Sequence, residues 1–175
     1  MNKKRIMIWE GVGAVVAMLL GVLMHFAFKW TNECRFTAGL FPVNESVWEH
    51  CKLTFIPFLE FGVLEFIFLR KRVNNFFSAK AAAATVATLL TVILYYLYTA
   101  FTGNNYMLAD IIIFVVSILL GQYISYRLLT SPRLEKGCEW VSIVWIILVL
   151  GLFCYFSFSP PLLGIFMDPK GFYGI

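Results

Sequence analysis

Long apolar segments alternate with short polar connections along most of the chain. A helix needs about 20 mainly apolar residues to cross the hydrocarbon core of a bilayer, and five segments come close to this length. They cover roughly residues 6–28, 45–69, 81–101, 107–126 and 140–158, with a loop at 29–44 and a tail at 159–175. The pattern predicts an all-α bundle of five transmembrane helices that forms one domain over residues 1–175.

The composition narrows the class of protein in the same direction. Hydrophobic residues make up 61% of the chain and charged residues 14%, and the mean hydropathy is +0.81. Soluble domains average about 45–50% apolar and about 25% charged residues. These values exclude a disordered chain, a secreted disulfide scaffold and an ordinary cytosolic enzyme. They predict a multi-pass membrane protein surrounded by lipids.

The charges that flank the apolar segments predict the orientation. Of the 14 Lys and Arg residues, ten lie at one set of segment ends and four at the other. The larger set is Lys3, Lys4, Arg5, Arg70, Lys71, Arg72, Lys80, Arg127, Arg133 and Lys136, and the smaller set is Lys29, Arg35, Lys52 and Lys170. Positive charge favours the cytoplasmic side, so the amino terminus is predicted inside and the carboxyl terminus outside.

Two further conclusions follow from these segment ends. The first apolar segment is too long for a cleaved signal sequence and has no suitable cleavage site, so we expect a retained helix. Because the basic residues sit at helix ends, they leave no basic surface for a nucleic acid.

The stretch from Asn44 to Lys52 is the most informative one in the chain. Asn44 is a good N-cap, so we expect a helix that begins at Glu45 and continues into the second segment. At about 100° per residue, Glu45, Glu49 and Lys52 lie on one helical face, and Glu60 lies close to the same face.

Both histidines of the chain fall at one membrane depth, on the outer side. His25 ends the first segment and His50 begins the second, and Asp110 and Asp168 lie at the same level. Ionisable residues inside a membrane usually face one another or a water-filled cavity. Histidines and carboxylates together form the ligand set of zinc and other divalent metals that activate water for hydrolysis.

We therefore predict one polar pocket at the outer-leaflet level. Its predicted metal ligands are His25, His50, Glu49 and Asp168, its predicted catalytic carboxylates are Glu45 and Glu49, and its other polar residues are Asn44, Lys52, Asp110, Glu60 and Glu10.

Two functions fit this pattern. One is a membrane-embedded, metal-dependent hydrolase that acts on a lipid or a peptide. The alternative is a non-enzymatic membrane protein, either an accessory subunit or a small transporter whose proton or cation path continues through Glu60 and Glu10. A pocket that ends above Glu60 favours the enzyme, and a polar track through to Glu10 favours transport. A purely structural reading also remains, in which the charged residues of a capped helix end pair with one another.

Other polar residues carry simpler expectations. Glu65 lies near Arg70, Lys71 and Arg72 in the sequence and is expected to pair with them. The four cysteines have no C-x-x-C spacing and are expected to be small buried side chains. A bridge between Cys34 and Cys51, both on the outer side, is the alternative.

The string from Pro42 to His50, Pro-Val-Asn-Glu-Ser-Val-Trp-Glu-His, resembles a motif of an uncharacterised family of small bacterial integral membrane proteins, defined only as a domain of unknown function. His25-Phe26 ahead of Trp30 resembles the family's first outer boundary, and the closing segments 166–169 and 173–175 resemble its carboxyl-terminal signature. The resemblance covers nearly the whole chain. It implies a bacterial plasma membrane location and supplies no activity.

This chain departs from the family pattern at one point. A histidine often follows the paired prolines in the family, but Leu162 and Leu163 stand there in this chain. The departure argues against a third histidine ligand.

Overall fold

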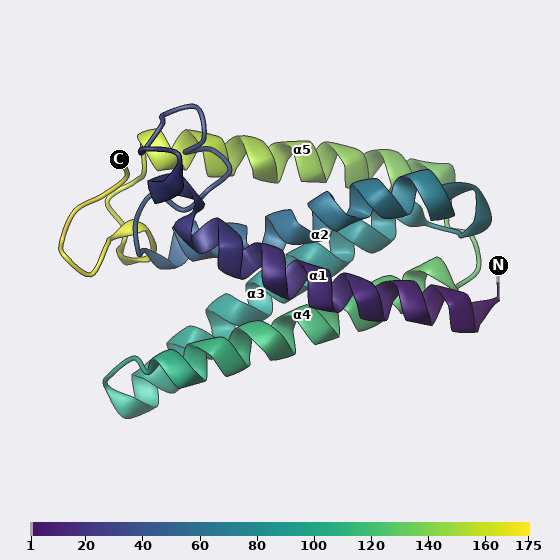
Figure 1. Ribbon diagram of the computed structural model, residues 1–175, viewed down its shortest axis with the longest axis horizontal. Helices are drawn as coiled ribbons and strands as arrows, with labels where there is room; N and C mark the ends of the chain where they lie inside the picture. Colours follow the sequence, from purple (N-terminus) through teal and green to yellow (C-terminus); the bar gives the residue numbers. More distant parts are fainter. Residues whose placement is uncertain (1) are drawn as a thin grey trace.

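The computed structural model describes residues 2–175, which form five long α-helices and two short 3₁₀ turns (Figure 1). The helices are α1 (Lys3–Trp30), α2 (Val47–Leu69), α3 (Phe76–Thr102), α4 (Met107–Leu129) and α5 (Lys136–Phe158), and the turns are η1 (Arg70–Arg72) and η2 (Gly164–Phe166). The only strand-like pairing among the described residues is an isolated bridge between Met167 and Tyr173. The predicted all-α fold is confirmed.

Four of the helices, α1, α3, α4 and α5, are long and apolar enough to cross a membrane. α2 is not among them because it carries Glu49, Lys52, Glu60 and Glu65. The structure is therefore compatible with a membrane protein.

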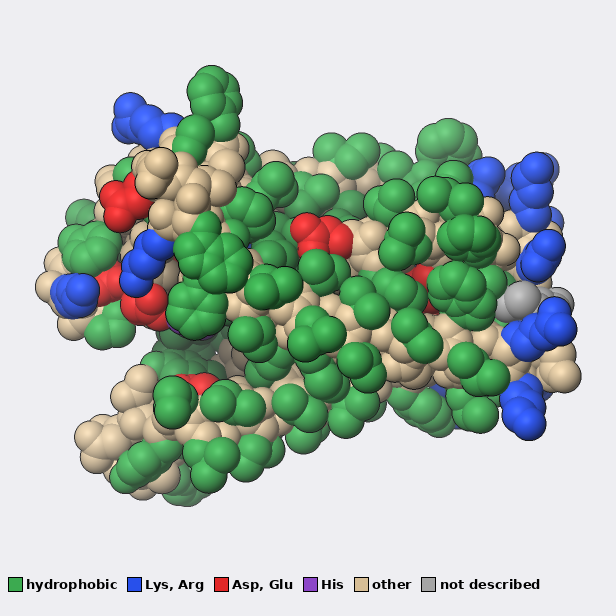
Figure 2. Space-filling view, viewed as in Figure 1, with side chains coloured by type: hydrophobic (Ala, Val, Ile, Leu, Met, Phe, Trp, Pro, Cys, Tyr) green, Lys and Arg blue, Asp and Glu red, His purple; other side chains and the backbone are tan. Residues whose placement is uncertain are grey.

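Consecutive helices run in opposite directions, so α1, α3 and α5 begin at the same end of the molecule (Figure 1). We call this end the basic end, because Lys and Arg side chains gather there in Figure 2. The opposite end, which holds residues 31–46 and 159–175, is called the loop end. There the tip of the α3–α4 hairpin diverges from the other helices (Figure 1).

Small side chains allow the central helices to approach closely. Ala83, Ala84 and Ala87 of α3 are fully buried in the main core cluster, together with Phe55 and Phe58 of α2. Gly121 of α4 packs against this cluster, where a Cβ atom would lie 2.5 Å from the Phe58 ring and 3.0 Å from the Ala83 carbonyl oxygen. By contrast, α5 buries only Phe153 and Ser157, and it packs mainly against α3.

A buried ionic network joins α1, α2, α3 and α4 in the half of the bundle nearer the basic end. The Lys80 ammonium donates to Glu10 Oε1 at 3.0 Å and to Ser125 Oγ at 2.9 Å, and it also contacts Glu65 Oε2. All four residues are buried. The expected pairing of Glu65 with the Arg70–Arg72 segment is wrong, because Glu65 shares the inward face of α2 with Phe58, Gly62 and Leu69.

The cysteines are all free thiols, so the alternative of a bridge between Cys34 and Cys51 is wrong for this structure. The expectation of buried side chains holds for Cys51 only. Cys138 and Cys154 are exposed and Cys34 is intermediate.

Replacing Lys80 tests how much its buried network with Glu10 and Glu65 contributes to stability. Lys80→Met removes the cation and leaves the Glu10 and Glu65 carboxylates buried together, which should cost about 3–5 kcal/mol. The free energy of unfolding in detergent is the measurement. Lys71→Met, at an exposed lysine of the basic end, is the matched control and should change stability by less than about 0.5 kcal/mol. Equal effects of the two substitutions would contradict a stabilising role for the network.

Candidate functional site

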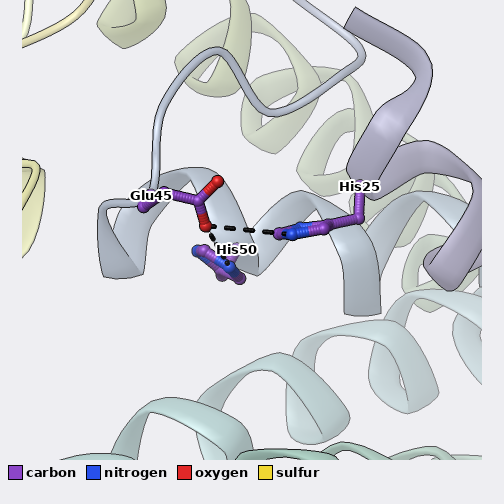
Figure 3. A group of neighbouring side chains, drawn as sticks. All are labelled: His25, Glu45 and His50. Carbon is purple, nitrogen blue, oxygen red and sulfur yellow. Dashed lines mark ion pairs between the residues drawn. The ribbon is translucent and has the colours of Figure 1, made fainter. Parts of the chain in front are cut away.

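Three side chains, from α1, from the 31–46 loop and from α2, converge at the loop end (Figure 3). His25 Nε2 lies 3.8 Å from Glu45 Oε2, and His50 Nε2 lies 3.5 Å from the same oxygen. The two imidazole centroids are 5.3 Å apart, and one ligand atom from each residue falls within 4.8 Å of the other two. We call these three residues the His–Glu cluster.

The start of α2 explains how Glu45 reaches this position. Ser46, not Asn44, is the N-cap, because its hydroxyl accepts from the Glu49 backbone N–H at 3.3 Å. The Asn44 side chain instead accepts from the Ser46 N–H at 2.9 Å and donates to the Gly174 carbonyl. The prediction of Asn44 as the cap and of a helix from Glu45 was therefore wrong, and the helix begins at Val47.

The start of α2 at Val47 brings Glu45 next to His50. With Ser46 as the cap, Glu45 occupies the position before the cap and His50 the fourth helical position, and these two positions pack together in a hydrophobic staple. In this chain the pair at those positions is polar, with the 3.5 Å contact between Glu45 and His50. Asp168 from the tail fixes the backbone here by accepting from the Glu45 N–H at 2.8 Å.

The ring of His50 is held in a defined orientation. Its Nδ1 lies 2.9 Å from the Ser46 carbonyl oxygen, so Nδ1 carries the proton that this hydrogen bond needs. Nε2 faces Glu45. A backbone carbonyl on the second ring nitrogen is the usual support of a metal-binding histidine.

Glu49 lies outside the cluster, in a second buried ionic network. Its carboxylate accepts from Lys52 Nζ at 2.6 Å, from Ser157 Oγ at 2.9 Å and from the Val43 N–H at 3.0 Å. Lys52 also donates to the Ala38 carbonyl oxygen at 2.8 Å. The network joins α2, the 31–46 loop and α5, and Glu49 and Lys52 are both buried within it.

A groove of about 710 Å³ opens beside the His–Glu cluster, where Figure 2 shows the surface notched at the loop end. Its histidines and carboxylates are the three cluster residues and Asp110. Most of the remaining wall is apolar and includes Val22, Leu53, Val92, Ile111, Ile113 and Phe114. Asp110 accepts from the Tyr98 hydroxyl at 2.6 Å, which joins α3 to α4.

The structure thus unites some of the predicted pocket residues and separates others. His25, Glu45, His50 and Asp110 line the groove, whereas Asn44, Glu49, Lys52 and Asp168 are buried beside it. Glu10 belongs to the Lys80 network. Glu60 is exposed on α2, and the described residues offer it no hydrogen bond or ion pair.

Sequence reasoning missed Ser46, Ser157 and Lys80. Only Ser46 had a local signal, since Ser46-Val47-Trp48-Glu49 matches the capping-box pattern.

The cluster geometry is suited to a divalent metal. Ligand atoms at about 2.0–2.2 Å from a tetrahedral ion lie roughly 3.4 Å from one another. The observed 3.5 Å and 3.8 Å separations from Glu45 are close to that value, and all three ligand atoms lie within 4.8 Å of one another. Two imidazole nitrogens and one carboxylate form the three-ligand set of many catalytic zinc sites, which keep a fourth position open.

The helices and this site define the class of the protein as an all-helical, membrane-type bundle with a polar cluster at one end. The chain belongs to a family of unknown function, DUF6512, which it matches over residues 1–175. The predicted membership of an uncharacterised family is confirmed. Neither the curated proteins nor the solved structures contain a match.

Substitutions at the N-cap test the helix start that positions the cluster. Ser46→Ala removes the hydroxyl that accepts from the Glu49 N–H and should cost about 1 kcal/mol of stability, whereas Ser46→Gly should cost only a few tenths. Unfolding in detergent measures both. Equal losses for Ser46→Ala and Ser46→Gly would show that burial of Ser46, and not capping by its hydroxyl, sets its contribution to stability.

Proposed function

We propose that this protein is a metal-dependent hydrolase embedded in the bacterial plasma membrane, with His25, Glu45 and His50 as metal ligands. The observation that carries the proposal is the placement of this ligand set on the wall of a large and mainly apolar groove. Zinc is the first candidate, because His₂Glu sites with an open position are typical of zinc hydrolases. When bound, the ion polarises a carbonyl group and makes water a better nucleophile at neutral pH.

The groove supports a lipid as the substrate. Its volume lies in the usual range of about 300–1,000 Å³ for ligand sites, and its wall suits an acyl chain better than a peptide. An ester of that lipid would then lie at the His–Glu cluster.

Asp110 is the carboxylate that lines the groove outside the cluster, so we assign it the role of general base. Its hydrogen bond from Tyr98 orients the carboxylate. Glu49, the other predicted catalytic carboxylate, is paired with Lys52, which favours a positioning role for it.

The transport alternative receives less support from the same geometry. Along α2 the groove reaches Leu53 and Thr54, and the next inward-facing residues are the buried Phe55 and Phe58. These rings interrupt a polar route toward Glu10. Glu60 lies on the exposed surface of α2 instead of on such a route.

We also propose that α2 crosses the membrane as a fifth span, with the amino terminus in the cytoplasm. Three of its four charged residues have ionic partners inside the protein, Glu49 with Lys52 and Glu65 with Lys80, which Glu65 shares with Glu10. This reduces the cost of burying them in a bilayer. The loop end, and the His–Glu cluster with it, would then face the outer leaflet.

Metal content is the decisive test of the proposed function. Protein purified in detergent, stripped with a chelator and reloaded with zinc should retain about one ion per chain by elemental analysis. His25→Ala and His50→Ala should each abolish retention, because two remaining ligands bind zinc weakly. The loaded protein should release fatty acid from vesicles of bacterial phospholipids, and Asp110→Asn should lose this release while retaining the ion.

Glu60→Gln is the matched control, since it removes a carboxylate on the exposed face of α2, outside the groove. It should change neither metal retention nor turnover. Retention that survives loss of either histidine would refute the ligand set, and a stoichiometric ion without hydrolysis of any lipid ester would refute the assigned reaction.

The orientation is tested by labelling single cysteines in a cysteine-free background. Cysteines placed at Lys71 and at Lys136 should be protected from a membrane-impermeant reagent added to intact cells, because both belong to the cytoplasmic side. Cysteines placed at Arg35 and at Lys170 should react. Protection at Lys170 together with reaction at Arg35 would require an odd number of spans between them, instead of the four of the five-span topology, and would overturn that topology.

A further inference from the structure

A second cavity lies at the basic end, opposite the His–Glu cluster. It has a volume of about 1290 Å³ and is lined by the starts of α1, α3 and α5 and by η1. Six basic residues from separate parts of the chain line it: Arg5, Arg70, Lys71, Arg72, Arg133 and Lys136. All six are exposed at the end of the molecule that carries most of the Lys and Arg side chains in Figure 2. We call this cavity the basic bowl.

The lining of the basic bowl carries an excess of positive charge. Glu139 is the one acidic residue in its lining, and its carboxylate already accepts from the Phe77 N–H at 2.8 Å. The lining thus holds six basic side chains and one carboxylate. A concave surface with charge of one sign concentrates counterions of the opposite sign.

Helix starts add to this preference for an anion. The N-cap residues of α3 and α5, Asn75 and Glu135, make no side-chain capping hydrogen bond. In the first turn of α3 the Phe77 N–H already donates to the Glu139 carboxylate, so α5 is the helix whose start lacks a side-chain cap. First-turn N–H groups without a cap favour phosphate. The helix starts support the basic side chains and do not form a site without them.

The bowl also has an apolar wall, which narrows the class of ligand. Phe76, Phe77, Trp140 and Ile143 line it alongside the basic residues. The Arg70 guanidinium lies 5.8 Å from the centroid of the Phe77 ring, so charged and apolar surfaces are in contact. A soluble phosphate compound needs only the charged part, whereas a phospholipid uses both.

Orientation of the chain does not require this arrangement. The positive-inside effect depends on charge near the helix ends and not on a cavity. Lys3, Lys4 and Arg127 supply such charge at the same end and lie outside the bowl. The gathering of the other basic residues around one apolar wall is the feature that orientation leaves unexplained.

We propose that the basic bowl binds an anionic phospholipid, with the headgroup phosphate among the Arg and Lys side chains and part of an acyl chain against Phe76, Phe77 and Trp140. Basic pockets between transmembrane helices on the cytoplasmic side bind anionic headgroups in this way. The site is separate from the groove at the loop end and does not depend on the proposed hydrolase activity.

Two charge-matched triple variants test the proposal. Lys71→Gln/Arg133→Gln/Lys136→Gln removes three bowl residues, and Lys3→Gln/Lys4→Gln/Arg127→Gln removes three basic residues from the same end but outside the bowl. Binding of phosphatidylglycerol to the full-length protein in phosphatidylcholine nanodiscs is measured by native mass spectrometry. The bowl variant should bind roughly 100-fold more weakly than the parent, and the control variant should stay within about fivefold of it.

A third variant separates loss of charge from loss of structure. Lys71→Arg/Arg133→Lys/Lys136→Arg keeps every charge and should retain binding, with an unfolding midpoint equal to that of the parent. Equal weakening in the bowl and control variants would show a diffuse basic surface and overturn the proposal. Inorganic pyrophosphate that displaces phosphatidylglycerol at equal concentration would identify a soluble phosphate ligand instead and would also overturn it.

Discussion

The buried pair of Lys52 and Glu49 is the interaction on which the architecture of the loop end depends. Each charge has its partner 2.6 Å away, and their remaining hydrogen bonds reach the 31–46 loop and Ser157 of α5. A buried charge without a partner costs several kcal/mol, so these segments have to close over the pair. α5 has few other buried contacts, and its end is located by this network. The tail, which follows α5, then brings Asp168 to the Glu45 backbone.

Burial separates two roles among the glutamates of this protein. Glu10, Glu49 and Glu65 are buried and each is paired with a lysine. Glu45 is half exposed and meets only histidines. A paired and enclosed carboxylate holds helices together but has no free face for a ligand. Among these four glutamates, Glu45 is the one whose carboxylate lines the groove.

The sequence was sufficient for the helices but not for every side-chain partner. Apolar segment length located all five helices, because that signal depends on composition alone. The depth argument also placed His25 and His50 near each other. Which carboxylate lies between the two histidines depends on where α2 begins. A shift of two residues turns a side chain by about 200° around the helix axis. Ser46 and Asn44 both suit an N-cap, and the choice between them is made by Gly174 and Asp168, more than 120 residues away. Lys80 was equally hidden, because Glu65 has three nearer cations in sequence.

Synthesis from the amino terminus sets the order in which the residues of the Lys80 network appear. Glu10 and Glu65 are synthesised before Lys80, so both carboxylates lack their shared cation until α3 is made. A charged residue at the centre of a membrane helix costs about 2.5–3.5 kcal/mol during insertion. α2 would therefore gain little from entering the bilayer alone and would be held in place only when α3 arrives beside it. Under the proposed five-span topology, the second helix would thus reach its final position only after the third, which carries Lys80.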